Sequence, residues 1–170
     1  TTSLGMVAAG YGVSTLDLNG HTLNVSIGEG AAFRFSNTHV ATPGTIKVLE
    51  NRGCISFING GSDLRMASLD FTGDVRFYVT GKLGDLRLDE NALSFTLGHV
   101  PYKGEVYGKL TMLADNFCNY ELQDGSTLDI AERTNVLNVV GSDSYQHFLS
   151  VASNAVVTVN LAGRPLTLGE

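Results

Sequence analysis

The sequence has no tryptophan, only two cysteines and few charged residues, and each shortage excludes a class of protein. Charged residues make up 16% of the chain, which argues against a segment kept unfolded by its own charge. Two cysteines are too few for a disulfide scaffold and form no Cys-x-x-Cys metal motif. Cys54 and Cys118 are either two small core side chains or one cross-link. Without tryptophan, the exposed aromatic platform of many sugar-binding modules is missing.

The chain also lacks the positive charge and the long apolar runs that two further classes need. Its net charge is −6, so we do not expect binding to nucleic acid, whose backbone requires clustered Lys and Arg. No apolar run approaches the ~18 residues that cross a bilayer, and no signal peptide is visible. With 170 residues, 43% of them hydrophobic, the chain is one domain or a segment of a longer protein.

Short stretches of alternating apolar and polar residues fill the sequence, and helical periodicity is nearly absent. Alternation with a period of two, bounded by Gly, Asn or Asp, predicts β-strands. The expected strands are residues 15–18, 22–27, 32–35, 45–48, 54–58, 63–66, 68–71, 75–79, 85–88, 93–97, 106–113, 120–122, 127–130, 136–140, 155–161 and 165–168. Turns are expected at 19–20, 51–53, 59–61 and 124–125, and one helical turn at 143–147.

A four-residue module recurs along these strands, with a Leu or Ile second and another apolar residue last. The Leu or Ile residues of the modules are Leu16, Ile46, Leu64, Leu86, Leu110, Leu128 and Leu166. Most steps between them are roughly 18–24 residues, a quasi-period typical of a solenoid whose coils stack over one shared core. We therefore expect an all-β solenoid, and a β-sandwich or jelly roll is the alternative.

Stacking of the modules makes two further predictions. The four residues Leu64, Leu86, Leu110 and Leu128 should form one buried ladder. The stretches 63–65 and 85–87 are both Asp-Leu-Arg, so they should stack and form a ladder of opposite charges on the outer face.

Residues 16–25 (LDLNGHTLNV), together with 124–130 and 153–159, resemble a known kind of repeat. They are similar to the strand–turn–strand phrases of right-handed parallel β-helices in bacterial surface proteins, above all autotransporter passenger domains. The resemblance implies a right-handed parallel β-helix of roughly six to eight coils. It also implies that residues 1–170 are a single segment of a longer exported protein, placed at the bacterial cell surface or outside the cell as a stalk or adhesin.

Acidic and histidine residues give no pattern of a catalytic or metal site. Aspartates in or beside the modules are Asp17, Asp63, Asp70, Asp85, Asp89 and Asp129. Stacked carboxylates bind Ca²⁺ or act as acid and base in some β-helix enzymes, but a solvated outer face explains the same pattern. The four histidines have no metal-ligand spacing. We expect no catalytic residue, no metal and no cofactor.

Residues 100–108 depart from the repeat and form the predicted binding site. Breaks in a repeat map to loops, which often bind partners, so we expect this segment to project, with Gly104 and Gly108 allowing two turns. The predicted contact residues are Tyr102, Lys103, Glu105 and Tyr107. The expected partner is a host surface or a glycan.

The function predicted from these observations is that of a non-catalytic structural or adhesive segment. One alternative is a carbohydrate-active enzyme or a carbohydrate-binding module on a β-helix. The other is a segment of a phage tail spike, which uses the same fold as a trimer.

Overall fold

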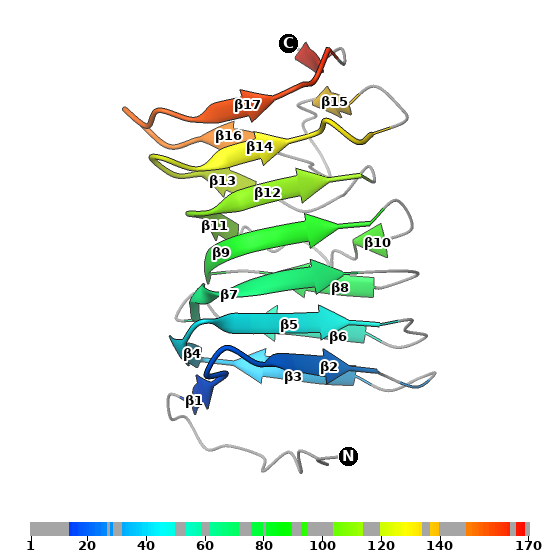
Figure 1. Cartoon of the computed structure of the whole chain (residues 1–170), viewed down its shortest axis with the longest axis vertical. Coiled ribbons are helices and arrows are strands. Elements are labelled where there is room, and N and C mark those ends of the chain that lie inside the picture. Colours follow the sequence, from blue (N-terminus) through cyan, green and yellow to red (C-terminus); the bar gives the residue numbers. More distant parts are fainter. Residues whose placement is uncertain are drawn as a thin grey trace.

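The computed structural model describes residues 14–26, 28, 32–49, 54–58, 62–71, 76–79, 81–89, 93–94, 104–113, 120–133, 137–139, 149–163 and 166–168. Within these ranges every regular element is a β-strand. Figure 1 shows the strands stacked in successive turns along the long axis, from β1 (Ser14–Asp17) to β17 (Thr158–Asn160). The described strand pairs are all parallel. Parallel stacking is typical of a β-solenoid, whereas a sandwich pairs its strands antiparallel.

The described strands lie on three faces, and the chain passes from the first face to the second in every described turn. The first face contains β1, β4 (Thr38–Thr42), the start of β7 (Asp63–Phe71), the start of β9 (Gly81–Leu88), β11 (Gly104–Val106), β13 (Tyr120–Leu122) and β16 (Leu149–Val151). The second face contains β2 (Thr22–Val25), β5 (Gly44–Val48), the ends of β7 and β9, β12 (Lys109–Met112), β14 (Thr127–Asp129) and β17. These two faces form one 12-stranded sheet.

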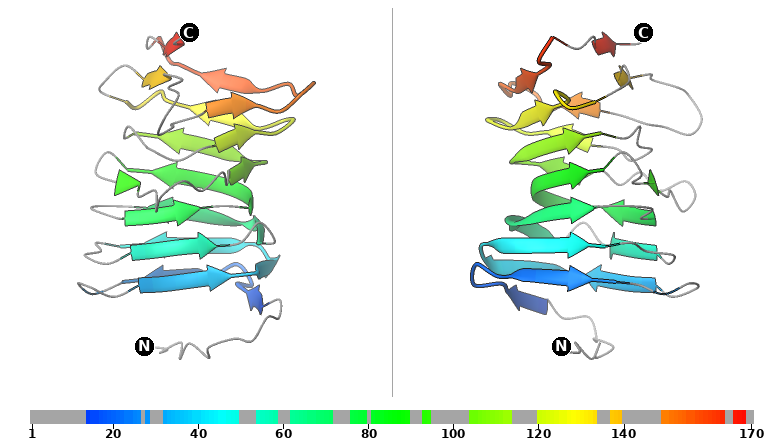
Figure 2. Two further views of the ribbon diagram at one scale, coloured as in Figure 1. Left: turned by 180° about the vertical axis from the view of Figure 1, so that it is seen from behind. Right: turned by 45° about the vertical axis from the view of Figure 1, so that its right-hand side comes forward.

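The third face lies behind the second in Figure 1 and is seen from the other side in the left view of Figure 2. A 4-stranded sheet on this face contains β3 (Ala32–Ser36), β6 (Cys54–Ile58), β8 (Arg76–Val79) and β10 (Leu93–Ser94). A 2-stranded sheet contains β15 (Leu137–Val139) and β18 (Leu166–Leu168).

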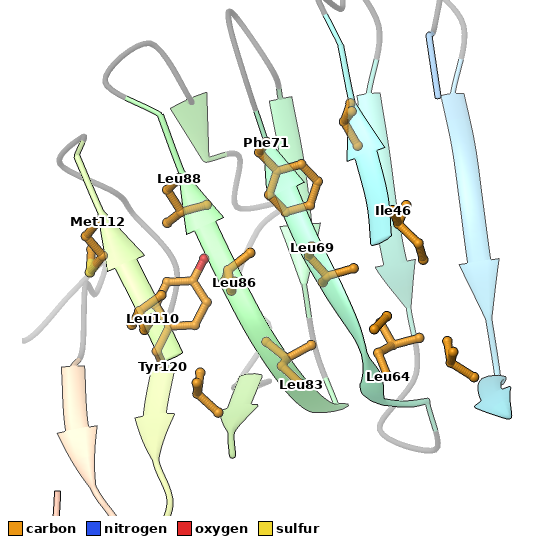
Figure 3. Close-up of a cluster of buried hydrophobic side chains, with 14 of the residues drawn as sticks. Ile46, Leu64, Leu69, Phe71, Leu83, Leu86, Leu88, Leu110, Met112 and Tyr120 are labelled. Carbon is orange, nitrogen blue, oxygen red and sulfur yellow. The ribbon is translucent and has the colours of Figure 1, made fainter. Parts of the chain in front are cut away.

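Inward side chains of successive turns form apolar ladders inside the coil. On the second face Ile46 pairs with Leu69, Leu69 with Leu86, and Leu86 with Leu110, which pairs with Leu128. All five side chains are buried, and Figure 3 shows several of them side by side. Full burial of such a side chain contributes about 1.5–3 kcal/mol, so this stacking is the main source of stability.

The expected ladder of four leucines is correct for three of them and wrong for Leu64. Leu64 is buried, but it pairs with Leu83 on the first face, and that ladder continues through Val106 and Leu122. The module at 63–66 begins on the first face because β7 runs around the corner before it reaches the second. Identical sequence modules therefore occupy different faces of the solenoid.

The expected stacking of the two Asp-Leu-Arg stretches is wrong for the same reason. Asp63 pairs with Lys82, and Asp85 lies beside Ser68. A row of opposite charges does exist on the second face, where Asp70 is 3.6 Å from Lys47 Nζ and 3.3 Å from Arg87 Nη1. Exposed pairs of this kind contribute about 0–1 kcal/mol each, so the row adds little to the stability of the stack.

Most predicted strands are present, but the expected strands 63–66 and 68–71 form the single strand β7, and the expected strand 85–88 begins at Gly81 in β9. β4 and β16 were not expected, and the expected strand 106–113 is divided between β11 and β12. The turns at 19–20 and 124–125 are confirmed, and Asn19, Gly20 and Gly125 adopt the left-handed conformation. Several expected features lie outside what the structure describes: the turns at 51–53 and 59–61, the helical turn at 143–147, the residue Cys118 and the side chain of Cys54.

Candidate functional site

A β-bulge at the corner between the first and second faces creates the candidate site. Between two paired regions of β7 and β9, residues 65–67 of β7 oppose Gly84 of β9 alone. A bulge bends the strand and redirects its side chains. As a result, Arg65 and Met66 are exposed at the corner, and the Met66 side chain retains 45% of its accessible surface.

Two glycines in the next turns allow close packing at this corner. A Cβ on Gly84 would clash with the carbonyl oxygen of Arg65, and a Cβ on Gly108 would clash with the carboxylate of Asp85. Neither position therefore has room for a side chain. An open pocket of about 300 Å³ lies at this corner, and its lining includes Arg65, Met66, Ser68, Gly84, Asp85, Tyr107 and Gly108.

Four side chains from two turns hold one another at the edge of this pocket. The Arg65 guanidinium donates two hydrogen bonds to Asp63, from Nε to Oδ1 at 2.9 Å and from Nη2 to Oδ2 at 2.8 Å. Its Cζ lies 5.4 Å from the centre of the Tyr107 ring, within cation–π range. The Tyr107 hydroxyl donates to Glu105 Oε2 at 3.0 Å. Arg65 and Tyr107 are thus fixed before any ligand arrives.

These contacts shift the acidity of the groups involved. The hydrogen bonds from Arg65 lower the pKa of Asp63, and the same contact raises the pKa of Arg65. Partial burial, followed by the hydrogen bond to Glu105, raises the pKa of Tyr107. At neutral pH the site therefore presents a guanidinium cation, a carboxylate and a neutral phenol.

Asp85 supplies a second carboxylate on the other side of the pocket. Its Oδ1 accepts the backbone N–H of Lys109 at 2.8 Å, and its Oδ2 accepts the Ser68 hydroxyl at 3.4 Å. The pocket thus combines hydrogen-bond donors and acceptors with the apolar surface of Met66 and Tyr107. A few fixed polar groups around an apolar patch are the usual composition of a small-molecule site.

Two of the predicted site residues lie at this corner. Glu105 is half-buried, and Tyr107 retains 36% of its accessible surface, whereas Tyr102 and Lys103 lie outside the described residues. The expected projection is wrong for residues 104–108. Gly104 is buried in β11, where a Cβ would collide with Leu83, so this glycine serves close packing and not a turn.

Sequence reasoning missed the other half of the site. Asp63 and Arg65 are two positions apart, so both side chains are expected on the same face of a strand. This spacing predicted a solvated ion pair and no binding site. The contact of Arg65 with Tyr107 depends on the bulge and on how the two turns are aligned. The alternation of apolar and polar residues predicts neither the bulge nor this alignment.

The described residues contain no group of His, Cys, Asp or Glu side chains arranged to hold a metal ion. They also contain no helix that is long and apolar enough to span a membrane. Comparison of the chain with known protein families, with curated proteins and with solved structures finds no match.

Proposed function

We propose that this chain is a non-catalytic segment of an exported bacterial surface or secreted protein, and that it binds a glycan at the corner pocket. The proposed fold is a right-handed parallel β-helix. In Figure 1 the second-face strands run left to right in front and the third-face strands run right to left behind, while the chain climbs from β2 to β17. This path supports the right-handed form.

The main support for the proposal is the fixed pair of Arg65 and Tyr107 in the lining of the corner pocket. Sugar rings combine apolar C–H faces with hydroxyl groups that both donate and accept hydrogen bonds. The Tyr107 ring and Met66 offer apolar surface, while Arg65 donates and Asp85 accepts. The groups are held by their neighbours, so little side-chain entropy is lost when a ligand is bound.

The open shape of the site favours binding over catalysis. The carboxylate of Asp63 is held by its hydrogen bonds to Arg65 and is not free to act on a ligand. A glycosidase needs one carboxyl group whose pKa is raised so that it can act as an acid, whereas the pKa of Asp63 is lowered. The stacked strands then serve as a rigid support for the corner.

The proposal is tested by measuring binding of the chain to a panel of neutral and acidic oligosaccharides. Arg65→Met and Tyr107→Ala should each weaken binding by about tenfold, which corresponds to 1.4 kcal/mol. Lys47→Met is the matched control, because Lys47 is a partly exposed cation on the second face that does not line the pocket. Wild-type protein that binds no glycan, or variants that bind as well as wild type, would contradict the proposal.

The same samples test the enzyme alternative and the location. Incubation with polysaccharides should release no new reducing ends; their release would support a hydrolase or lyase instead. In cells of the source organism, the protein should be accessible to protease added from outside. Protection of the protein in intact cells would contradict export to the surface.

A further inference from the structure

The lining of the corner pocket contains one carboxylate whose charge is not balanced by an ion pair. Asp85 lines the pocket, and its side chain accepts hydrogen bonds from the backbone N–H of Lys109 and from the hydroxyl of Ser68. Both donors are electrically neutral. In the described part of the chain, the carboxylates of Asp63 and Asp70 have Lys or Arg partners, whereas Asp85 forms no such pair.

The cation next to Asp85 in the ladder is directed elsewhere. Lys109 begins β12 and lies beside Asp85 of β9, one turn further along the second face (Figure 1). Its Nζ, however, is 3.8 Å from Asp129 Oδ2 in the following turn. The Lys109 backbone thus holds the Asp85 carboxylate in place, while the Lys109 ammonium group pairs with a different carboxylate.

The cations on the first-face side of the corner are already matched by carboxylates. The Arg65 guanidinium donates two hydrogen bonds to Asp63. Lys82 is exposed and stands between Asp63 and Glu105 in the first-face ladder. Among the described lining residues Arg65 is the only Lys or Arg, so the unbalanced charge of the pocket is that of Asp85.

An ammonium group is the ligand chemistry that suits this arrangement. A carboxylate forms a shorter and stronger hydrogen bond with a charged donor than with a neutral one, and Asp85 Oδ2 has only the 3.4 Å contact with Ser68. The Tyr107 ring and Met66 supply apolar surface in the same pocket. Among glycans, sugars with a free amino group combine an ammonium with the apolar C–H face of a ring.

Acidic sugars are the least suitable glycans for the same reason. Their carboxylates would lie near Asp85, and like charges placed together in an interface weaken binding. Arg65, the cation in the lining, already has Asp63 as its partner. The net charge of the whole chain is −6, which attracts cationic ligands and repels anionic ones.

We propose that the corner pocket selects glycans that carry free amino groups, with a sugar ammonium bound to the Asp85 carboxylate. This inference rests on the glycan binding proposed above for the same pocket. Arg65 and Tyr107 hold the sugar ring, and Asp85 decides which sugars are preferred. Neutral sugars bind the same surface more weakly, because their hydroxyl groups offer Asp85 only an uncharged donor.

Binding of three oligosaccharides of equal length and linkage tests this preference. They are built from glucosamine, N-acetylglucosamine and glucose, and only the first carries ammonium groups in mildly acidic buffer. The glucosamine oligomer should bind about tenfold more tightly than either of the others, and raising the salt concentration should narrow the difference. Equal binding of all three would overturn the preference and leave glycan binding intact, whereas binding of none would overturn both.

Substitution of the carboxylate tests whether Asp85 is the partner of the ammonium. Asp85→Asn keeps an oxygen that accepts the Lys109 N–H, and it should weaken binding of the glucosamine oligomer about tenfold without changing binding of the N-acetylglucosamine oligomer. Asp124→Asn is the matched control, because Asp124 is also exposed and accepts a backbone N–H of the next turn, from Val156 at 2.8 Å, but does not line the pocket. Circular dichroism checks that both variants keep the wild-type structure. Equal losses in the two variants, or equal losses for the two oligomers, would contradict the role of Asp85.

Lys109→Gln gives a test in the opposite direction. It removes the cation next to Asp85 but keeps the backbone N–H that fixes the carboxylate. Affinity for the glucosamine oligomer should rise about threefold, the effect of one exposed charge, and affinity for the glucose oligomer should not change. A fall in affinity for the glucosamine oligomer would contradict the placement of the ammonium at Asp85.

A lysine oligomer with the same number of ammonium groups separates sugar recognition from general attraction of cations. It has no sugar ring to lie against Tyr107 and Met66, so it should bind about tenfold more weakly than the glucosamine oligomer. Equal binding would mean that the pocket accepts any cationic polymer, and the proposal of an amino sugar would be wrong.

Discussion

At the scale of single residues, alternate side chains along β9 have different surroundings and should contribute differently to the free energy of unfolding. Leu86 is fully buried, while Arg87 is half-buried and bonds to Asp70 on the outside. We expect Leu86→Ala to lower the free energy of unfolding by about 2–5 kcal/mol and Arg87→Ala by less than about 1 kcal/mol. Urea unfolding measures both changes. Equal losses would contradict the assignment of Leu86 to the inside and Arg87 to the outside of the coil.

Gly84 should tolerate no side chain because the bulge of β7 presses against it. A Cβ there collides with the carbonyl oxygens of Arg65 and Ala67. Gly84→Ala should therefore lower the free energy of unfolding by about 1–3 kcal/mol and reduce ligand binding at the corner. Gly28→Ala is the control, because a Cβ at Gly28 meets nothing within 4 Å, and the change should stay within about 0.5 kcal/mol. Similar effects at the two positions would argue against the close packing.

The ion pair at the corner makes stability depend on pH in one direction. The folded-state pKa of Asp63 is lowered from 3.8 by its bonds to Arg65, so the folded state favours the ionised carboxylate. This contribution is complete above pH 3.8 and is lost as the pH falls through the lower folded-state pKa. The stability difference between wild type and Asp63→Asn should be largest near pH 7 and shrink as the pH falls below 3.8. A difference that is constant over this range would contradict the shift.

At the scale of strands, the ends of the stack should open more readily than its middle. β9 lies between β7 on one side and β11 and β12 on the other, whereas β17 pairs only with β14 in the described structure. Each turn of a solenoid is stabilised by its neighbours, and local opening is easiest where few buried contacts exist. Hydrogen exchange followed by mass spectrometry should therefore protect peptides of β9 far longer than those of β16 and β17. Uniform protection would mean that the chain unfolds only as one unit.

The strands were predictable from the sequence to the extent that they follow the repeated module. The bounds of β6 and β13 match the expected ones because alternation and flanking polar residues define them well. β4 was missed because its only large apolar residue is Val40, so the module's Leu or Ile is absent. β16 was missed because Leu149 also fits helical spacing with its neighbours. The local alternation of apolar and polar residues therefore predicts where strands lie better than it predicts which strands pair.

The candidate site could be predicted only in part for a related reason. Tyr107 and Glu105 stood out because they interrupt the repeat, and they do lie at the corner. The residues that Tyr107 and Glu105 meet there depend on the bulge, in which residues 65–67 oppose a single glycine. Close packing against Gly84 decides the position of this bulge, and no periodicity in the sequence reveals it. The sequence interval between turns also varies, as Leu69 to Leu86 and Leu86 to Leu110 illustrate, so stacking partners cannot be counted off at a fixed step.

At the scale of the whole molecule, stacking brings distant parts of the sequence into one small surface. Asp63 and Arg65 lie in one turn, Asp85 in the next and Tyr107 in the turn after that, and all four meet at one corner. A solenoid needs only a local change in two or three turns to make such a site, while the ladders above and below remain regular.

The all-β architecture predicts the far-ultraviolet circular dichroism of the complete chain. The described residues contain strands and turns only, and elsewhere the sequence fits helical spacing only around residues 143–147. The spectrum should therefore show β structure and almost no helix. Ordinary domains are about one-third helical, so a helical fraction above roughly one quarter would contradict the solenoid.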